Sequence, residues 1–181
     1  LCDRRQRQMC IRDRDLNSLD PNKAVGSGTL EILFNIYEGL YKPDSDGNLI
    51  PAVASDYTVS DDKKVYTFTL RDGIQFHNGN PVTVEDVKYS IEKCAGNGTG
   101  EPLISAFSNI ESVETPDDKT IVISLTEPED DFLALVSTVN AAIVPADVDD
   151  LETNPVGTGP YKFVSRSLQE NVVLKKFDAY W

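Results

Sequence analysis

The stretch that decides the fold is DGNLIPAVASDYTVSDDKKVYTFTLRDGIQFHNGNPVTVEDVKYSIE, residues 46–92. Within it, DYTVS (56–60) and KVYTFTLR (64–71) flank a short polar turn, a pattern that predicts a β-hairpin. The second strand places three large apolar side chains on one face: those of Tyr66, Phe68 and Leu70. Because side chains alternate between the two faces of a strand, we expect this aromatic face to be buried.

The same stretch runs into a predicted helix, TVEDVKYSIEKC (83–94). Thr83 stands at the N-cap position, and Asp86 stands where it can complete a reciprocal capping box. Acidic residues in the first turn suit the helix dipole. The apolar side chains recur at helical spacing, at Val84, Val87, Ile91 and Cys94. We expect this stripe to pack against the rest of the chain.

Working outward, the remaining segments predict more helices and hairpins. The expected elements are a helix over 29–40, a hairpin of strands 110–115 and 119–126, a short helix over 130–139, and paired strands over 161–165 and 170–177. Antiparallel hairpins interleaved with helices indicate an α/β or α+β chain.

A tight turn, GTGP (157–160), precedes the last strand pair. We expect Gly157 and Gly159 to meet a backbone requirement there, either a positive φ or the close approach of another segment. Phosphate binding is not expected, because a P-loop has GK[ST] after its glycines and none follows here.

The charge of the chain is strongly acidic, with 30 Asp and Glu against 17 Lys and Arg, and a net charge of −13. An acidic surface repels phosphate backbones, so we expect no nucleic-acid partner. It also disfavours docking on anionic lipid without a separate anchor. Residues 1–14 (LCDRRQRQMCIRDR) have the opposite sign. We interpret them as non-native or disordered material in place of the true N-terminus, the alternative being a flexible basic arm.

Few residues offer catalytic or metal chemistry. The chain has one histidine and three cysteines, with no CxxC pair, so neither a zinc site nor a disulfide framework nor a cofactor is expected. His77 lies in a turn, FHNG, where we expect a surface or hairpin-end role rather than that of a base or metal ligand. Paired carboxylates are plentiful, but they fall at predicted hairpin tips and helix starts, where solvation explains them. No GxSxG elbow is present.

Several segments, taken together and in order, resemble the family 5 extracellular solute-binding proteins, the dipeptide, oligopeptide and nickel group. They are LDP (19–21), NIYEGL (35–40), the stretch 46–92, VGTGPYKF (156–163) and FDAYW (177–181). The resemblance implies an α/β fold of the type II periplasmic-binding-protein kind, present in part. By this resemblance 15–42 and 154–181 belong to the first lobe and 43–153 form the extra subdomain, while the second lobe is missing.

The resemblance also implies a ligand-binding loop after the first strand, formed by Ala24, Val25, Gly26 and Ser27. Such a loop lines the cleft and offers backbone groups to an extended ligand, which suits broad peptide specificity. The alternative, that the glycines only connect strand to helix, stays open. Leu103 and the pair Asn140–Ala141 are further candidates by position. The absence of bulky aromatic or Arg side chains at Ala24, Leu103 and Ala141 weighs against a nickel complex.

The implied function is capture of a peptide-like solute by lobe closure, followed by delivery to the permease subunits of an ABC transporter, with no chemical step. We expect a monomer at the periplasmic or extracellular face of the membrane, tethered through a missing N-terminal lipid anchor. Two other classes remain: a secreted carbohydrate-active enzyme that uses a carboxylate pair such as Glu85/Asp86 or Glu129/Asp130, and a sensor domain fused to a DNA-binding module.

Overall fold

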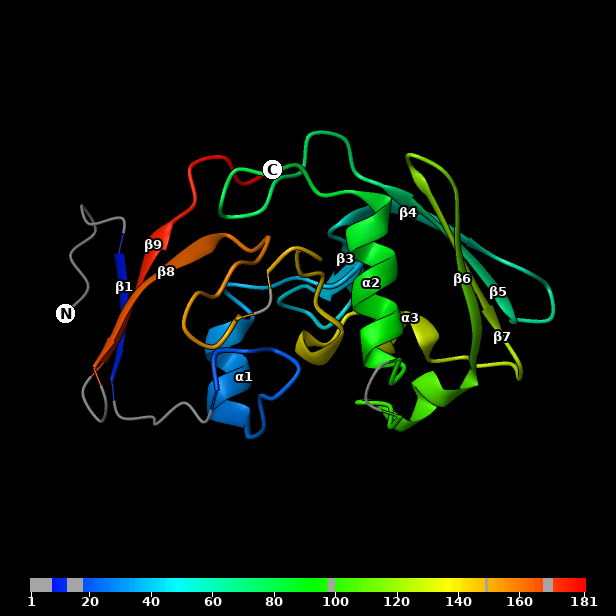
Figure 1. Cartoon of the computed structure of the whole chain (residues 1–181), viewed down its shortest axis with the longest axis horizontal. Helices are drawn as coiled ribbons and strands as arrows, with labels where there is room; N and C mark the ends of the chain where they lie inside the picture. Colours follow the sequence, from blue (N-terminus) through cyan, green and yellow to red (C-terminus); the bar gives the residue numbers. More distant parts are fainter. Residues whose placement is uncertain (1–7, 13–17, 98–99, 149, 168–170) are drawn as a thin grey trace.

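The computed structural model of the chain describes residues 8–12, 18–97, 100–148, 150–167 and 171–181. The chain forms an elongated α/β body with a small sheet at one end and a larger sheet at the other, and helix α2 (Val84–Cys94) stands between them (Figure 1). The candidate binding loop runs into α1 (Ser27–Leu33), which lies between the small sheet and α2 (Figure 1).

The larger sheet has four antiparallel strands in the order β4-β5-β7-β6. Its strands are β4 (Ala54–Val59), β5 (Val65–Leu70), β6 (Ile110–Asp117) and β7 (Thr120–Leu125). Both predicted hairpins are therefore confirmed. The buried face of β5 carries the predicted side chains, and the matching face of β7 adds three more: Tyr66, Phe68, Leu70, Ile121, Ile123 and Leu125 are all buried.

Helix α2 packs on β6 and β7 of this sheet. Its predicted capping box is present: Asp86 N–H donates to Thr83 Oγ1 at 3.2 Å, and Thr83 N–H donates to Asp86 Oδ2 at 2.9 Å. All four residues of the predicted apolar stripe are buried. Ser90 then ties α2 to the segment that follows the short 3₁₀ helix η2 (Val139–Ala141), because its hydroxyl donates to Val144 O and accepts from Val144 N–H.

The smaller sheet has the order β1-β9-β8, with β8 (Tyr161–Ser167) and β9 (Asn171–Lys176) forming the predicted strand pair. Strand β1 (Gln8–Arg12) runs antiparallel to β9 on its other side. These five residues belong to the segment 1–14, whose other residues lie outside the described part of the chain. The interpretation of 1–14 as non-native or disordered therefore stays a prediction.

Helix α1 differs from the predicted helix over 29–40, because it begins at Ser27 and ends at Leu33. The prediction is wrong for 34–40. Backbone carbonyls that a helix over 29–40 would have used internally are taken by distant partners: Tyr161 N–H donates to Asn35 O, and Gly159 N–H donates to Ile36 O, both at 2.9 Å. These tertiary hydrogen bonds compete with the helix and end it. The chain continues through β2 (Tyr41–Pro43) and β3 (Leu49–Pro51).

The short helix expected over 130–139 is also shorter in the structure, as α3 (Phe132–Leu135). After this helix the backbone tightens to 3₁₀ geometry, because Ser137 N–H donates to Ala134 O and Thr138 N–H donates to Leu135 O, three residues back rather than four. The 3₁₀ helix η2 follows, and another, η1 (Ser105–Asn109), precedes β6.

The two glycines of the GTGP turn lie directly on the segment after α1. A Cβ at Gly157 would lie 2.1 Å from Ile36 O, and a Cβ at Gly159 would lie 2.6 Å from Asn35 O. Neither glycine has a positive φ. The prediction that these glycines serve backbone geometry is confirmed, and close approach is the reason.

His77 lies in a turn closed by the antiparallel bridge between Gln75 and Pro81, so the predicted hairpin-end position is confirmed, but the residue is buried against the GTGP turn, so the predicted surface position is wrong. Its side chain is packed edge-on against Phe177 and is only 8% exposed. Gly157 N–H donates to Nδ1 at 3.4 Å, which assigns the ring proton to Nε2, where it is donated to Gly159 O at 2.9 Å. Burial, together with the nearby charge of Lys162, lowers the pKa of His77 to about 4. A neutral imidazole therefore holds the turn in place.

Candidate functional site

The loop before α1 is held by its own side chains and by a distant carboxylate. Asp20 Oδ1 accepts from Asn22 N–H at 2.9 Å, and Asp20 pairs with Lys23 at 3.4 Å. Glu152 accepts hydrogen bonds from the Ser18 hydroxyl and from Leu19 N–H. The loop is therefore a built structure rather than a loose connection.

Asn140, in η2, ties this loop to the rest of the body. Its side-chain nitrogen donates to Pro21 O at 2.9 Å and to Ala24 O at 3.4 Å. Its backbone carbonyl accepts from Asn22 Nδ2 at 3.2 Å and from Cys94 Sγ at 3.0 Å. We call Asn22, Cys94 and Asn140 the Asn140 cluster.

The third candidate segment reaches the same cluster from the end of α2. Leu103 N–H donates to Cys94 O at 2.8 Å, so the chain that follows the glycine-rich break returns to the last residue of the helix. The thiol of Cys94 is buried, and this burial raises its pKa to about 12. It therefore acts as a neutral hydrogen-bond donor. Three segments that are far apart in the sequence meet at the Asn140 cluster.

The predicted site residues differ in their solvent exposure. Ala24 and Ala141 are buried, so their side chains support the surface. Gly26 and Ser27 are exposed, Val25 is 69% exposed and Leu103 is 42% exposed. Asn140 is half-buried, with both its amide nitrogen and its backbone carbonyl already engaged.

The backbone conformation at Gly26 explains why this position is a glycine. Its φ is +90°, and a Cβ built there would meet nothing within 4 Å. The residue therefore serves the left-handed conformation that leads into α1, where Leu30 N–H donates to Gly26 O at 3.2 Å. This geometry supports the interpretation that Gly26 connects the loop to the helix. The backbone of the loop is still exposed at this residue.

Sequence reasoning missed two members of the Asn140 cluster. Asn22 carries no pattern that distinguishes it from any other loop asparagine, and Cys94 was identified only as part of the apolar stripe of α2. Their shared role depends on Asn140, a partner 118 residues from Asn22 and 46 residues from Cys94.

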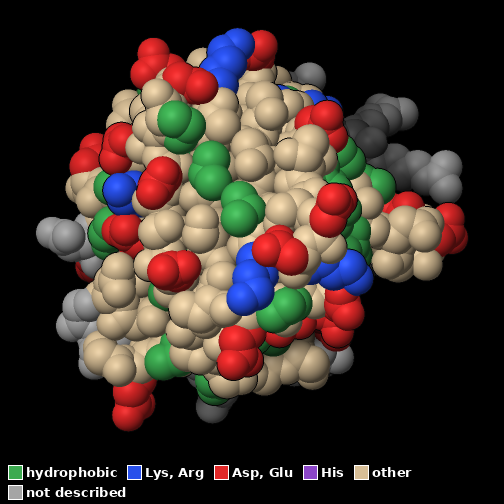
Figure 2. All heavy atoms as spheres, turned by 90° about the vertical axis from the view of Figure 1, so that its right-hand side faces the viewer, with side chains coloured by type: hydrophobic (Ala, Val, Ile, Leu, Met, Phe, Trp, Pro, Cys, Tyr) green, Lys and Arg blue, Asp and Glu red, His purple; other side chains and the backbone are tan. Residues whose placement is uncertain are grey.

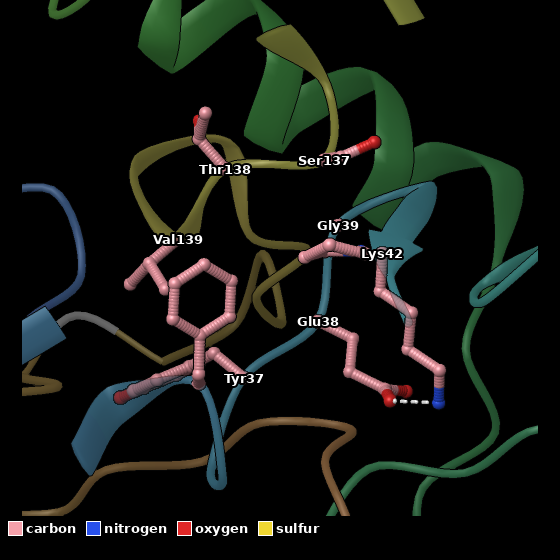
Figure 3. A pocket seen from close by; sticks show the side chains of 9 residues that line it. Tyr37, Glu38, Gly39, Lys42, Ser137, Thr138 and Val139 are labelled. Carbon is pink, nitrogen blue, oxygen red and sulfur yellow. Dashed lines mark hydrogen bonds and ion pairs between the residues drawn. The ribbon is translucent and has the colours of Figure 1, made fainter. Parts of the chain in front are cut away.

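A separate pocket of about 230 Å³ lies between the segment after α1 and the segment after α3 (Figure 3). Tyr37 and Glu38 approach it from one side, and Ser137, Thr138 and Val139 approach it from the other. Glu38 is buried and pairs with Lys42 at 2.8 Å.

The carboxylate of Glu38 is fully engaged by three donors. Besides Lys42, Tyr180 donates its hydroxyl to Glu38 Oε1 at 2.6 Å, and Trp181 Nε1 donates to Oε2 at 3.3 Å. Burial first, and then this hydrogen bond with Glu38, raise the pKa of Tyr180 above its usual value. The arrangement is that of a structural ion pair that joins the segment after α1 to residues 180–181, and the carboxylate of Glu38 is not a free acid or base.

The acidic pairs flagged in the sequence lie in turns and at a helix start. Asp62 and Asp117 accept hydrogen bonds at the hairpin tips, which lowers the pKa of both. In the first turn of α2, Glu85 accepts from the Thr115 hydroxyl while Asp86 caps the helix. Figure 2 shows acidic side chains spread over the face at the right-hand end of Figure 1, with basic ones among them.

Within the described ranges, no group of three or more His, Cys, Asp or Glu side chains could hold a metal ion. The described helices include none that is long and apolar enough to cross a membrane.

Comparisons with known proteins match nearly the whole chain. The family described as "Bacterial extracellular solute-binding proteins, family 5 Middle" matches residues 48–181. The glutathione-binding protein GsiB of Pectobacterium atrosepticum is 31% identical over 169 residues, which are 91% of this chain and 33% of that protein. The GsiB of Salmonella typhimurium is 30% identical over 172 residues, covering 92% of this chain and 34% of that protein. The chain thus spans about a third of the length of these curated relatives.

Solved structures agree with this match. The periplasmic binding protein DppA of Helicobacter pylori, in complex with the peptide STSA, superposes with a TM-score of 0.84 at 30% identity, over 94% of this chain and 39% of that chain. The binding protein AgaA from A. tumefaciens R10, in complex with agropinic acid, gives 0.84 at 31% identity, over 92% and 35% of the two chains. The expected fold class, a partial α/β fold of the type II periplasmic-binding-protein kind, is confirmed.

Proposed function

The chain belongs to family 5 of the bacterial extracellular solute-binding proteins, and we therefore propose that the whole protein captures a peptide-like solute and delivers it to an ABC transporter. The names of its relatives support a peptide-like solute: GsiB is a glutathione-binding protein, and the DppA structure holds the peptide STSA. The AgaA structure holds agropinic acid, so the solutes of similar proteins are not limited to these two.

The observation that carries the proposal is the meeting of three separated segments at the Asn140 cluster. Ala24 and Asn140 are joined directly by a hydrogen bond, and Leu103 is joined to Asn140 through Cys94. The family resemblance singled out these segments by their position, without indicating that they are joined. Hydrogen bonds at the Asn140 cluster hold the three segments together, and a ligand that contacts all three would meet a preorganised surface.

The proposed mechanism is binding without a chemical step. A solute lies against the exposed loop at Val25–Ser27 and beside Leu103, and a second lobe closes over it because the closed state binds the solute more tightly. Backbone groups of the loop can pair with an extended peptide irrespective of its side chains. We propose on this basis that the protein is not an enzyme.

The alternative of a carbohydrate-active enzyme has less support. Glu85 and Asp86 are engaged by Thr115 and by the helix cap, and Asp130 pairs with Lys63 at the surface. A glycosidase needs two carboxylates that face each other across a cleft. Neither proposed pair has that arrangement.

The organisation of the whole protein follows as part of the proposal. Residues 15–42 and 154–181 belong to the first lobe, which the small sheet supports, and 43–153 form the extra subdomain around the larger sheet (Figure 1). We propose a monomer on the periplasmic or extracellular face, tethered by an N-terminal lipid anchor, that hands its solute to the permease subunits. No nucleic-acid partner is part of this proposal.

The test is ligand binding by the full-length protein. Isothermal titration with tripeptides, reduced glutathione and maltotriose should give saturable binding of at least one peptide, with no binding of the sugar. Mass spectrometry of the recovered ligand should show it unchanged. Turnover of any of these compounds, or binding of the sugar alone, would contradict the proposal.

A further inference from the structure

The strand pair β8–β9 is basic in a chain that is strongly acidic. Its two strands contain Lys162, Arg166, Lys175 and Lys176 and no acidic residue, whereas the whole chain has a net charge of −13. Lys162 lies directly opposite Lys175 in the sheet. Like charges that face each other across two strands are destabilising. A negatively charged partner at this place would offset that cost.

Three of these lysines meet at one hollow of the surface. The hollow has a volume of about 290 Å³, and its lining residues are Lys162, Lys175, Lys176, Phe177, Asp178 and Ala179. Lys162 Nζ donates to His77 O at 2.6 Å and lies 4.4 Å from the centre of the Phe177 ring. Lys175 and Lys176 are exposed, and neither forms an ion pair with another described residue. Their amines are therefore available to a partner outside the chain.

The first strand begins beside the same lysines. Gln8, the first residue of β1, pairs with Lys175 on β9, and Lys175 pairs with Lys162 on β8. The chain therefore enters the small sheet at the hollow, at one end of the elongated body (Figure 1). Because β1 belongs to the segment 1–14, only its position in the sheet matters here, and not the identity of its side chains.

Acidic side chains are spread over the opposite end of the body, that of the larger sheet (Figure 2). At an ionic strength of about 0.1 M, charges separated by more than about 10 Å are largely screened, whether they attract or repel each other. An anionic surface against the small sheet therefore interacts with the three lysines and Asp178 of the hollow, and much less with the distant carboxylates.

From this juxtaposition we infer that the small-sheet end faces the membrane, where Lys175 and Lys176 contact anionic lipid headgroups. The inference rests on the N-terminal anchor of the proposed function and adds an orientation to it. Each lysine near an anionic bilayer strengthens binding only about fivefold, which is too little to hold so acidic a chain on its own. A tether supplies a high local concentration, so this weak attraction is then enough to orient the protein.

The experiment attaches the full-length protein, through an N-terminal hexahistidine tag, to vesicles that contain a nickel-chelating lipid. One set of vesicles is otherwise phosphatidylcholine, and the other also contains about 30% phosphatidylglycerol. A water-soluble acetylating reagent modifies exposed lysines, and mass spectrometry follows each one. Lys175 and Lys176 should react about fivefold more slowly on the anionic vesicles, and about 0.5 M NaCl should abolish this protection. Lys63 and Lys119, in the turns of the larger sheet, should react equally on both.

The variant Lys175→Gln/Lys176→Gln gives a second measurement, with Lys63→Gln/Lys119→Gln as its matched control. At a limiting content of the chelating lipid, the wild-type protein should need about tenfold less anionic lipid for half-maximal binding than the Lys175/Lys176 variant. On phosphatidylcholine the two should bind equally. The control should bind like the wild type on both kinds of vesicle, and circular dichroism should show that both variants are folded.

Equal reaction of Lys175 and Lys176 on the two kinds of vesicle, or equal binding by the wild type and the Lys175/Lys176 variant, would overturn the inference. Protection of these lysines by a soluble peptide of glutamates, but not by vesicles, would assign the surface to an acidic protein partner and overturn it as well. The tag replaces the natural anchor, so these results do not depend on it. The proposed function fails separately, if no tripeptide binds or if the native protein does not sediment with membranes.

Discussion

Asn140 Nδ2 lies 2.9 Å from Pro21 O, a hydrogen bond between residues 119 positions apart in the sequence. The same nitrogen reaches Ala24 O at 3.4 Å, so one amide holds both ends of a short loop segment. This segment leads directly to Val25 and Gly26 at the surface, so their position depends on a side chain from η2 as well as on the loop's own hydrogen bonds.

Replacing Asn140 should loosen this loop. In Asn140→Ala, the carbonyls of Pro21 and Ala24 lose their donor, and we expect unfolding in urea to become easier by about 1–3 kcal/mol. Solute affinity should fall as well, because the loop is no longer held. Asn78→Ala removes an exposed asparagine that bonds only locally and should cost less than about 0.5 kcal/mol. Equal losses in the two variants would contradict the assignment.

Adding a methyl group to the GTGP turn should be costly. In Gly157→Ala the new Cβ meets Ile36 O, a backbone atom that cannot rotate away, so we expect a loss of at least about 3 kcal/mol. Gly47→Ala is the comparison, because space is open there and only a φ of +84° opposes the change. Its cost should be about 1–2 kcal/mol. Urea unfolding of both variants measures the difference, and a smaller effect at Gly157 would argue against close approach as the reason.

His77 predicts a pH dependence of stability. Burial lowers its pKa to about 4, whereas the unfolded chain has a value near 6.5, so the unfolded state binds more protons between these limits. Stability should therefore be fully present above about pH 6.5 and decline as the pH falls toward 4. The loss attributable to this group is on the order of 3 kcal/mol.

His77→Gln isolates that contribution, because glutamine can still donate and accept but does not titrate. The free energy of unfolding, measured at pH 7.0, 5.5 and 4.5, should fall more steeply in the wild-type protein than in the variant. Parallel curves would show that the imidazole is not held neutral. Carboxylates such as Asp62 and Asp117, whose pKa values are lowered, lose their contribution at lower pH and affect both proteins alike.

The ion pair between Glu38 and Lys42 should matter more than an exposed pair. Lys42→Met leaves a buried carboxylate with two neutral donors, Tyr180 and Trp181, and should cost about 2–4 kcal/mol. Adding Glu38→Gln to this variant should recover part of the loss, which a double-mutant cycle measures. Lys63→Met breaks the exposed pair with Asp130 and should have little effect. The assignment fails if the two lysine variants behave alike.

Local chemistry explains which parts of the fold were predictable. The hairpins β4–β5 and β6–β7 follow from polarity alternation across short polar turns, and α2 follows from its capping box and apolar stripe. Each of these signals acts between residues that are a few positions apart. The loop, Leu103 and Asn140 were identified from the family resemblance, without any indication of how they are joined.

What the sequence determined by itself was therefore the set of hairpins, the helix α2 and the acidic character of the chain. Tertiary structure decided where α1 ends, since Asn35 O and Ile36 O accept from the N–H groups of Tyr161 and Gly159. It also decided that His77 is buried and that Asn22 and Cys94 share a partner in Asn140. The physical reason is that a backbone carbonyl or a side-chain amide has no preferred distant partner until packing brings one within hydrogen-bond distance.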